Sequence, residues 1–149
     1  MVPNFASRFA LAIVSLAISH FVSGRSFQVV AYNVENLFDT DGVSLYDDYK
    51  PEFYGPKELQ NKLNSIVRSL RLIGGSTGPE VVLLQEIEVD RTPREFPSAT
   101  ELLLNALKKN GLGPYQVAQG YDPKDSPGNW PSVQCVTLSK FPISSTRLH

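Results

Sequence analysis

Two short apolar segments of the sequence end in side chains that carry oxygen ligands. Residues 80–86 read Glu-Val-Val-Leu-Leu-Gln-Glu and close on the carboxylate of Glu86, and residues 27–33 run to the amide of Asn33. Short apolar runs with polar ends are typical of buried strands. Ligands gather beyond the carboxyl ends of strands in open α/β sheets, and hard oxygen ligands suit Mg²⁺. The pair Asn33 and Glu86 is the strongest indication of a site in this sequence.

Each of these residues also has a simpler interpretation. Glu86 could be the first solvated residue after a strand. Asn33 could be a turn residue, because asparagine bonds to its own backbone and tolerates left-handed geometry. Loop residues are polar for many reasons, so neither residue predicts a site alone. The pair does so only if the two strands are adjacent and parallel.

The sequence between the two segments predicts a helix that would place them side by side. It begins at Pro56, which the first turn tolerates, and ends at Gly74 and Gly75. A strand, a helix and a strand form the right-handed crossover of a parallel pair, so Asn33 and Glu86 would meet at one edge. An antiparallel placement would separate them. The apolar face of the helix consists of Leu59, Leu63, Ile66, Val67, Leu70 and Ile73.

Further elements are predicted later in the chain. Ser98 begins a second helix as its N-cap, with Glu101 three residues on as the second half of a capping box. Residues 115–120 form a strand, and the segment that starts at Val136 forms another. Cys135 is the lone cysteine, so an intrachain disulfide is excluded. We interpret it as a buried small hydrophobe rather than a nucleophile.

Two loops hold charged or aromatic residues with open roles. The acids between Asp39 and Gly55 are interpreted as solvated, with helix capping or a second cation as alternatives. Arg91 and Arg94 could reach a phosphate, but we favour neighbouring acids as their partners. In the loop 122–132, Lys124 and Trp130 could touch a substrate.

Three motifs resemble the endonuclease/exonuclease/phosphatase superfamily. Residues 30–39 (Val-Ala-Tyr-Asn-Val-Glu-Asn-Leu-Phe-Asp) are similar to its opening strand, and residues 83–86 (Leu-Leu-Gln-Glu) to its metal-binding strand. Residues 136–143 (Val-Thr-Leu-Ser-Lys-Phe-Pro-Ile) are similar to a later strand and turn. The motifs occur in the family's order and span most of the chain after its first residues. Bacterial secreted members that begin Asn-Val-Glu-Asn-Leu-Phe-Asp share this opening.

The resemblance implies an α/β fold, namely the N-terminal portion of a two-sheet α/β sandwich. It implies hydrolysis of phosphate esters, often phosphodiesters, with Mg²⁺ or Mn²⁺. Glu86 would then be a metal ligand, and Asn33 would ligate the metal or orient the phosphate; both would be catalytic. The substrate would be a phosphate ester, with nucleic acid, a phospholipid and an inositol phosphate as candidates. The residues that select among them lie in loops.

The family's later motifs do not occur in this sequence. They supply an Asp-x-Asn pair, a catalytic histidine and a terminal Asp-His pair, whereas this chain has only His20 and His149. We therefore expect residues 25–149 to be a C-terminally incomplete domain that is inactive alone. The alternative is a catalytically inactive secreted module that uses the same scaffold for binding.

The first residues are typical of a signal peptide. Arg8 supplies the positive charge, an apolar stretch runs from Phe9 to Val22, and small residues precede cleavage after Gly24. The stretch is short and interrupted for a membrane span. We expect a secreted or periplasmic protein without stable membrane insertion after cleavage. A net charge of -1 and a pI near 6.1 indicate no bulk basic surface for nucleic acid.

Overall fold

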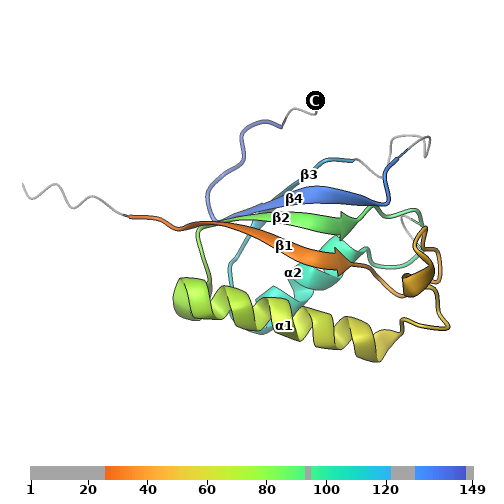
Figure 1. Ribbon diagram of the computed structural model, residues 1–149. Coiled ribbons are helices and arrows are strands. Elements are labelled where there is room, and N and C mark those ends of the chain that lie inside the picture. The colour runs from red at the N-terminus through yellow and green to blue at the C-terminus, as the bar shows by residue number, and fades with distance from the viewer. Residues whose placement is uncertain (1–25, 93–94, 122–129, 147–149) are drawn as a thin grey trace, which may run out of the picture.

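The described residues fold as one mixed sheet with two helices on one face (Figure 1). The computed structural model describes residues 26–92, 95–121 and 130–146. The strands are β1 (Val29–Leu37), β2 (Val81–Glu88), β3 (Gln116–Gln119) and β4 (Val133–Ser139), in the spatial order β1-β2-β4-β3. The helices are α1 (Pro56–Gly74) and α2 (Ala99–Lys109), with short 3₁₀ turns η1 (Asp47–Tyr49) and η2 (Gly75–Thr77). The predicted α/β class is confirmed.

The crossover that the sequence predicts joins the first two strands. β1 and β2 are parallel, with Val29 opposite Val81 and Asn33 opposite Gln85. α1 connects them, and β4 then pairs with β2 in the antiparallel direction. Because β1 and β2 run in the same direction, their carboxyl ends lie at the same end of the sheet (Figure 1).

α1 begins and ends where its sequence predicts. Pro56 is its first residue, the Glu58 carboxylate accepts the backbone N–H of Gly55 at 3.1 Å, and Gly74 is its last residue. Five of the six predicted apolar positions are buried. Ile73 is 48% exposed, because the last turn lies beside Gln28, before the first residue of β1, where no strand covers it. The core therefore forms between α1, α2 and one sheet face.

α2 follows the predicted capping box. The Ser98 hydroxyl accepts the backbone N–H of Glu101 at 3.2 Å, and the Glu101 carboxylate accepts the backbone N–H of Ser98 at 2.9 Å. This reciprocal pair satisfies two donors that the first turn would otherwise leave open. The side chains of Leu103 and Leu107 on α2 are buried in the core. None of the helices in the described ranges is long and apolar enough to cross a membrane.

Neither of the described helices covers the opposite face of the sheet (Figure 1). Side chains alternate along each strand, so Val82 and Leu84 enter the core while Leu83 between them is 39% exposed. The same alternation places Gln134 and Val136 inside and leaves Cys135 exposed. The predicted burial of Cys135 is therefore wrong, because its position in the strand points it to the face without helices.

Candidate metal and phosphate site

Asn33 and Glu86 lie in contact, as the parallel pairing of their strands requires. The Asn33 amide donates from Nδ2 to Glu86 Oε1 at 2.7 Å, and its Oδ1 accepts the backbone N–H of Glu35 at 2.7 Å. These two bonds fix which way the amide points. The second oxygen of Glu86 makes no hydrogen bond to a described residue. In this arrangement Asn33 orients the Glu86 carboxylate and leaves one of its oxygens for a ligand.

Both strands bulge at this point instead of ending there. The sequence predicts that they end at Asn33 and Glu86, whereas β1 continues to Leu37 and β2 to Glu88. Between the pairs Asn33–Gln85 and Leu37–Ile87, β1 holds three residues opposite one of β2. β2 also bulges against β4 at the same place. A bulge re-aims a side chain without breaking the sheet, and bulges are common beside active sites.

The backbone at the bulges is strained. Glu35, Asn36 and Glu86 have φ values of 55°, 63° and 64°. They are the only non-glycine residues with positive φ among those described. Asparagine tolerates this region, whereas a glutamate there is uncommon and costs about 1–3 kcal/mol. Three such residues at one point of the sheet show that the fold holds this backbone against its local preference.

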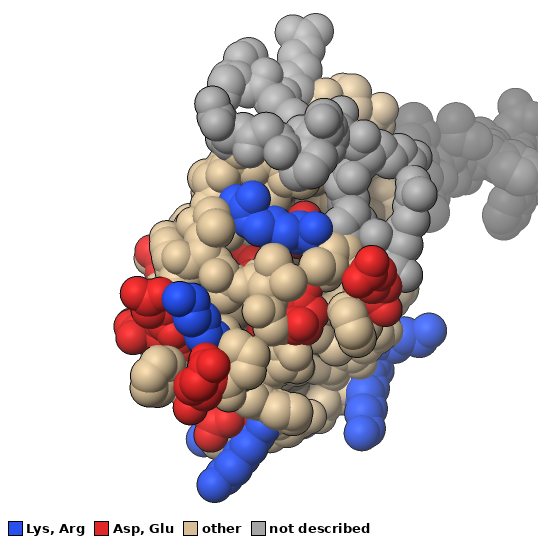
Figure 2. Space-filling model, turned by 90° about the vertical axis from the view of Figure 1, so that its right-hand side faces the viewer, with Lys and Arg blue, Asp and Glu red and all other residues tan. Residues whose placement is uncertain are grey.

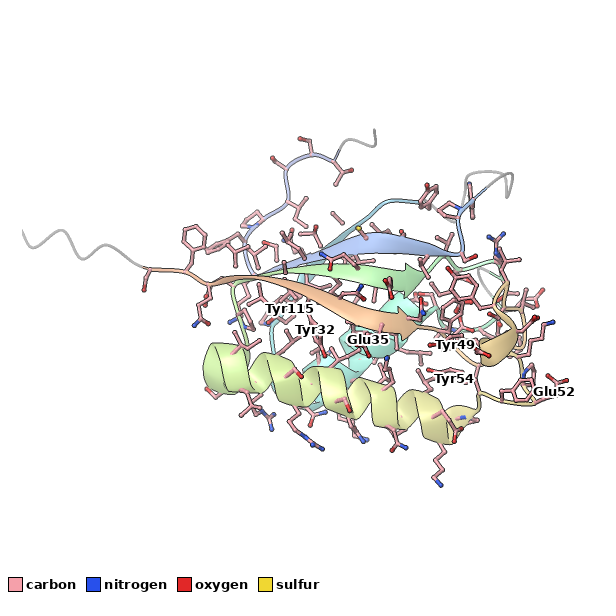
Figure 3. The ribbon with its side chains drawn as sticks, in the orientation of Figure 1. Tyr32, Glu35, Tyr49, Glu52, Tyr54 and Tyr115 are labelled. Carbon is pink, nitrogen blue, oxygen red and sulfur yellow. The ribbon has the colours of Figure 1, made fainter. Side chains whose placement is uncertain are left out.

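The bulge of β1 beside the site is tied to α1. Lys62 on α1 donates from Nζ to the backbone carbonyl of Glu35 at 2.8 Å, which ties the helix to the bulge. Asn33 is exposed and Glu86 is half-buried, so both can reach a ligand from solvent. In Figure 3, Tyr49 and Tyr54 lie between the tip of β1 and the first part of α1, whereas Glu52 lies at the outer edge.

A second group of carboxylates lies just beyond the same strands. Oxygens of Asp39, Asp41 and Asp90 come within 4.8 Å of one another. Thr92 donates its hydroxyl to Asp41, and Asp90 accepts the backbone N–H of Thr92 at 2.9 Å. The sequence favours solvated acids in the loop after Asp39, with a second cation as an alternative, and does not indicate that they lie beside Asp90. The one available signal was the position of Asp39 and Asp90 just after predicted strands.

Burial raises the pKa values of acids in this group and next to it. Glu88 is 6% exposed, and its carboxylate accepts the backbone N–H of Asp39 at 2.9 Å. Burial, with smaller contributions from the neighbouring acids, raises the pKa of Glu88 to about 8 and that of Asp39 to about 7. Burial also raises the pKa of Asp90. These acids are therefore held where their charged forms are disfavoured.

Charges at this end of the molecule are mixed. Figure 2, which looks onto the carboxyl ends of β1 and β2, shows acidic and basic groups interspersed on the described surface without a broad basic patch. A surface that neutralises a nucleic acid backbone is instead rich in clustered Lys and Arg. The described part of this face lacks such a cluster.

Several residues that the sequence singles out have other places. Arg91 donates to the backbone carbonyls of Trp130 and Pro131 at 3.0 and 3.2 Å, so it joins two loops and makes no ion pair with an acid among the described residues. The centroid of the Trp130 ring lies 6.0 Å from that of the Tyr121 ring. Trp130 is distant from Glu86 in the sequence and is not among the described residues that hydrogen-bond Asn33 or Glu86. The predicted signal peptide, which includes His20, and three other residues fall outside the described ranges: Arg94, Lys124 and His149.

Comparisons of the chain with models of protein families, with curated proteins and with solved structures find no match.

Proposed function

We propose that Asn33 and Glu86 form the metal- and phosphate-binding part of a Mg²⁺- or Mn²⁺-dependent phosphoesterase of the endonuclease/exonuclease/phosphatase type. The observation that carries the proposal is the hydrogen bond between the two side chains at a doubly bulged, left-handed point of the sheet. Strain of this kind collects at functional sites. The motifs around residues 33, 86 and 139 support it independently.

The side chains fit this chemistry. Glu86 offers a carboxylate oxygen, which a hard divalent cation prefers. Asn33 orients that carboxylate through one N–H of its amide, and the second N–H is suited to a phosphoryl oxygen. The bound cation would neutralise charge that builds on the phosphoryl and leaving oxygens. The attacking water needs a base, and we expect turnover to require residues beyond this pair.

The direct test is whether inorganic phosphate binds through the cation. We expect Mg²⁺ to shift the amide resonances of residues 33–36 and 86 in ¹H–¹⁵N spectra of the ¹⁵N-labelled chain. Phosphate should then bind at the same residues and do so at least ~10-fold more weakly in Asn33→Ala. Phosphate binding that is unchanged by removing Mg²⁺ would contradict the proposal.

We further propose that the uncovered sheet face packs against a second sheet, in the two-sheet sandwich that the resemblance implies. Two observations support this: the face carries uncharged side chains, among them Val29, Leu83 and Cys135, and the helices cover only the other side. Sheets that pack face to face bury such alternating residues. The proposal is consistent with the described sheet, which forms one layer.

A charged substitution on this face distinguishes a sheet face that packs against a second sheet from one that is exposed to solvent. Leu83→Glu would put a carboxylate between two sheets and should lower the free energy of unfolding by ~3 kcal/mol or more. On a bare face the same change should cost less than ~0.5 kcal/mol. Urea unfolding of the two proteins, each extended by the C-terminal part of the domain that the resemblance implies, gives the difference, and a value in the lower range would rule the second sheet out.

A further inference from the structure

An open groove runs alongside the candidate site. It lies between η1 and the first half of α1 and has a volume of about 420 Å³. Its walls include two tyrosines, two amides, two carboxylates and an ammonium: Tyr49, Tyr54, Asn36, Asn61, Asp48, Glu58 and Lys62. Neither the hydrogen bond between Asn33 and Glu86 nor the proposed chemistry uses this groove.

The groove borders the bulge of β1 at Asn36. Asn36 belongs to the strained bulge of β1 and also lines the groove. The side chain of Tyr49 also lines the groove. The negative charges of Glu86 and Glu35 also act on this phenol, whose pKa is raised mainly by burial. A ligand held at Glu86 would therefore extend into the groove beside Tyr49.

The aromatic wall is fixed in place. The rings of Tyr49 and Phe38 stack with centroids 4.2 Å apart, and Tyr54 lies 4.9 Å from Tyr49. The Tyr54 hydroxyl donates to the backbone carbonyl of Phe38 at 3.2 Å, which holds the ring against β1 (Figure 3). A rigid aromatic surface loses little conformational entropy when a ligand binds, and it packs well against the C–H face of a saturated ring.

The polar wall suits hydroxyl groups better than anions. The carboxylates of Asp48 and Glu58 and the side chains of Asn36 and Asn61 accept hydrogen bonds from hydroxyls. Lys62 is the one cationic side chain of the lining, and it already donates to the Glu35 carbonyl. Two carboxylates against one ammonium disfavour further phosphates.

We propose that this groove binds a neutral, hydroxyl-bearing ring, a sugar or cyclitol, whose phosphate group is held at Glu86. The inference rests on the proposed phosphoesterase function and narrows it to phosphate esters of small polyols. A polyanionic nucleic acid would have to place successive phosphates along carboxylates. The groove and the mixed charges around it both act against that.

The test uses three probes on the ¹⁵N-labelled full chain: methyl glucoside, glucose 1-phosphate with Mg²⁺, and a thymidine dinucleotide with Mg²⁺. We expect methyl glucoside to shift resonances of the groove residues, and glucose 1-phosphate to bind at least 10-fold more tightly at the groove and at residue 86. Asn61→Ala should weaken both at least 5-fold. Asn64→Ala, a change of the same kind at an exposed position of α1 outside the groove, should leave both unchanged.

Two results would overturn the inference. One is saturable binding of the dinucleotide in the groove with no response to methyl glucoside, which would assign the groove to nucleic acid. The other is glucoside binding with equal affinity in Asn61→Ala and the unaltered chain. The phosphoesterase proposal fails separately, when Mg²⁺ produces no shift at residues 33–36 and 86, because methyl glucoside has no phosphate and needs no cation.

Discussion

The substitution Glu86→Gln should reduce the affinity of the protein for Mn²⁺ by ~100-fold or more. Loss of a residue that only hydrogen-bonds a metal ligand typically costs about 10–100-fold, and loss of the ligand's own charge should cost at least as much. The change keeps the shape of the side chain and an oxygen that can accept the Asn33 amide. It removes the negative charge, which is the main attraction between this site and a hard cation. Isothermal titration with MnCl₂ gives the affinities of the two proteins directly.

Glu52→Gln is the matched control for this prediction. It removes the same charge from an exposed residue at the outer edge of the molecule, away from Asn33 and Glu86 (Figure 3). Its effect on Mn²⁺ affinity should stay below ~2-fold, because an exposed charge at a distance is screened by salt. Equal losses in the two variants would mean that Mn²⁺ responds to overall charge, and Glu86 would not be a ligand.

The stability of the fold should decrease by ~2 kcal/mol or more as the pH rises from about 4 to about 8. Burial raises the pKa of Glu88 from 4.5 to about 8 and that of Asp39 from 3.8 to about 7. Within this range the folded chain binds more protons than the unfolded chain, so each rise in pH favours unfolding. Below both unfolded pKa values the two states are equally protonated, and the penalty is absent. Urea unfolding at several pH values measures the slope.

Glu88→Gln should flatten this dependence and raise the stability at pH 8. Glutamine retains an oxygen that can accept the backbone N–H of Asp39 but carries no charge to desolvate. Asp48→Asn, at an exposed residue, is the control and should leave the slope as it is. If the free energy of unfolding of the unaltered chain stays constant across this range, Glu88 and Asp39 ionise freely and our account of their burial is wrong.

The sequence was sufficient for the elements whose signals are local. The spacing of Leu59, Leu63 and Leu70 and the glycines after them predict α1 with its bounds, because helical periodicity and caps are written in adjacent residues. The parallel pairing of β1 and β2 follows from that helix through the handedness of crossovers. The convergence of Asn33 and Glu86 was predictable for the same reason.

The geometry of the site was not predictable to the same degree. The left-handed backbone at Glu35 and Glu86 opposes what glutamate prefers, so no local pattern indicates it. It results from the register of three strands that are distant in the sequence. The grouping of Asp39 with Asp90 is also a tertiary effect, because the two carboxylates belong to different loops. The burial of Cys135 was predicted wrongly, because its apolar neighbours indicate a strand but do not indicate which face of the sheet each side chain points to.

The most direct test of the metal site is line broadening by Mn²⁺ in ¹H–¹⁵N spectra, because paramagnetic broadening falls steeply with distance from the ion. Two groups of oxygen atoms at this end of the sheet could hold a cation: Glu86 with Asn33, and the carboxylates of Asp39, Asp41 and Asp90. We predict that substoichiometric Mn²⁺ first broadens the amides of residues 33–36 and 85–87, and that Glu86→Gln abolishes this. Broadening that begins at residues 39–41 and 90–92 and persists in Glu86→Gln would place the cation at the aspartates and contradict the account.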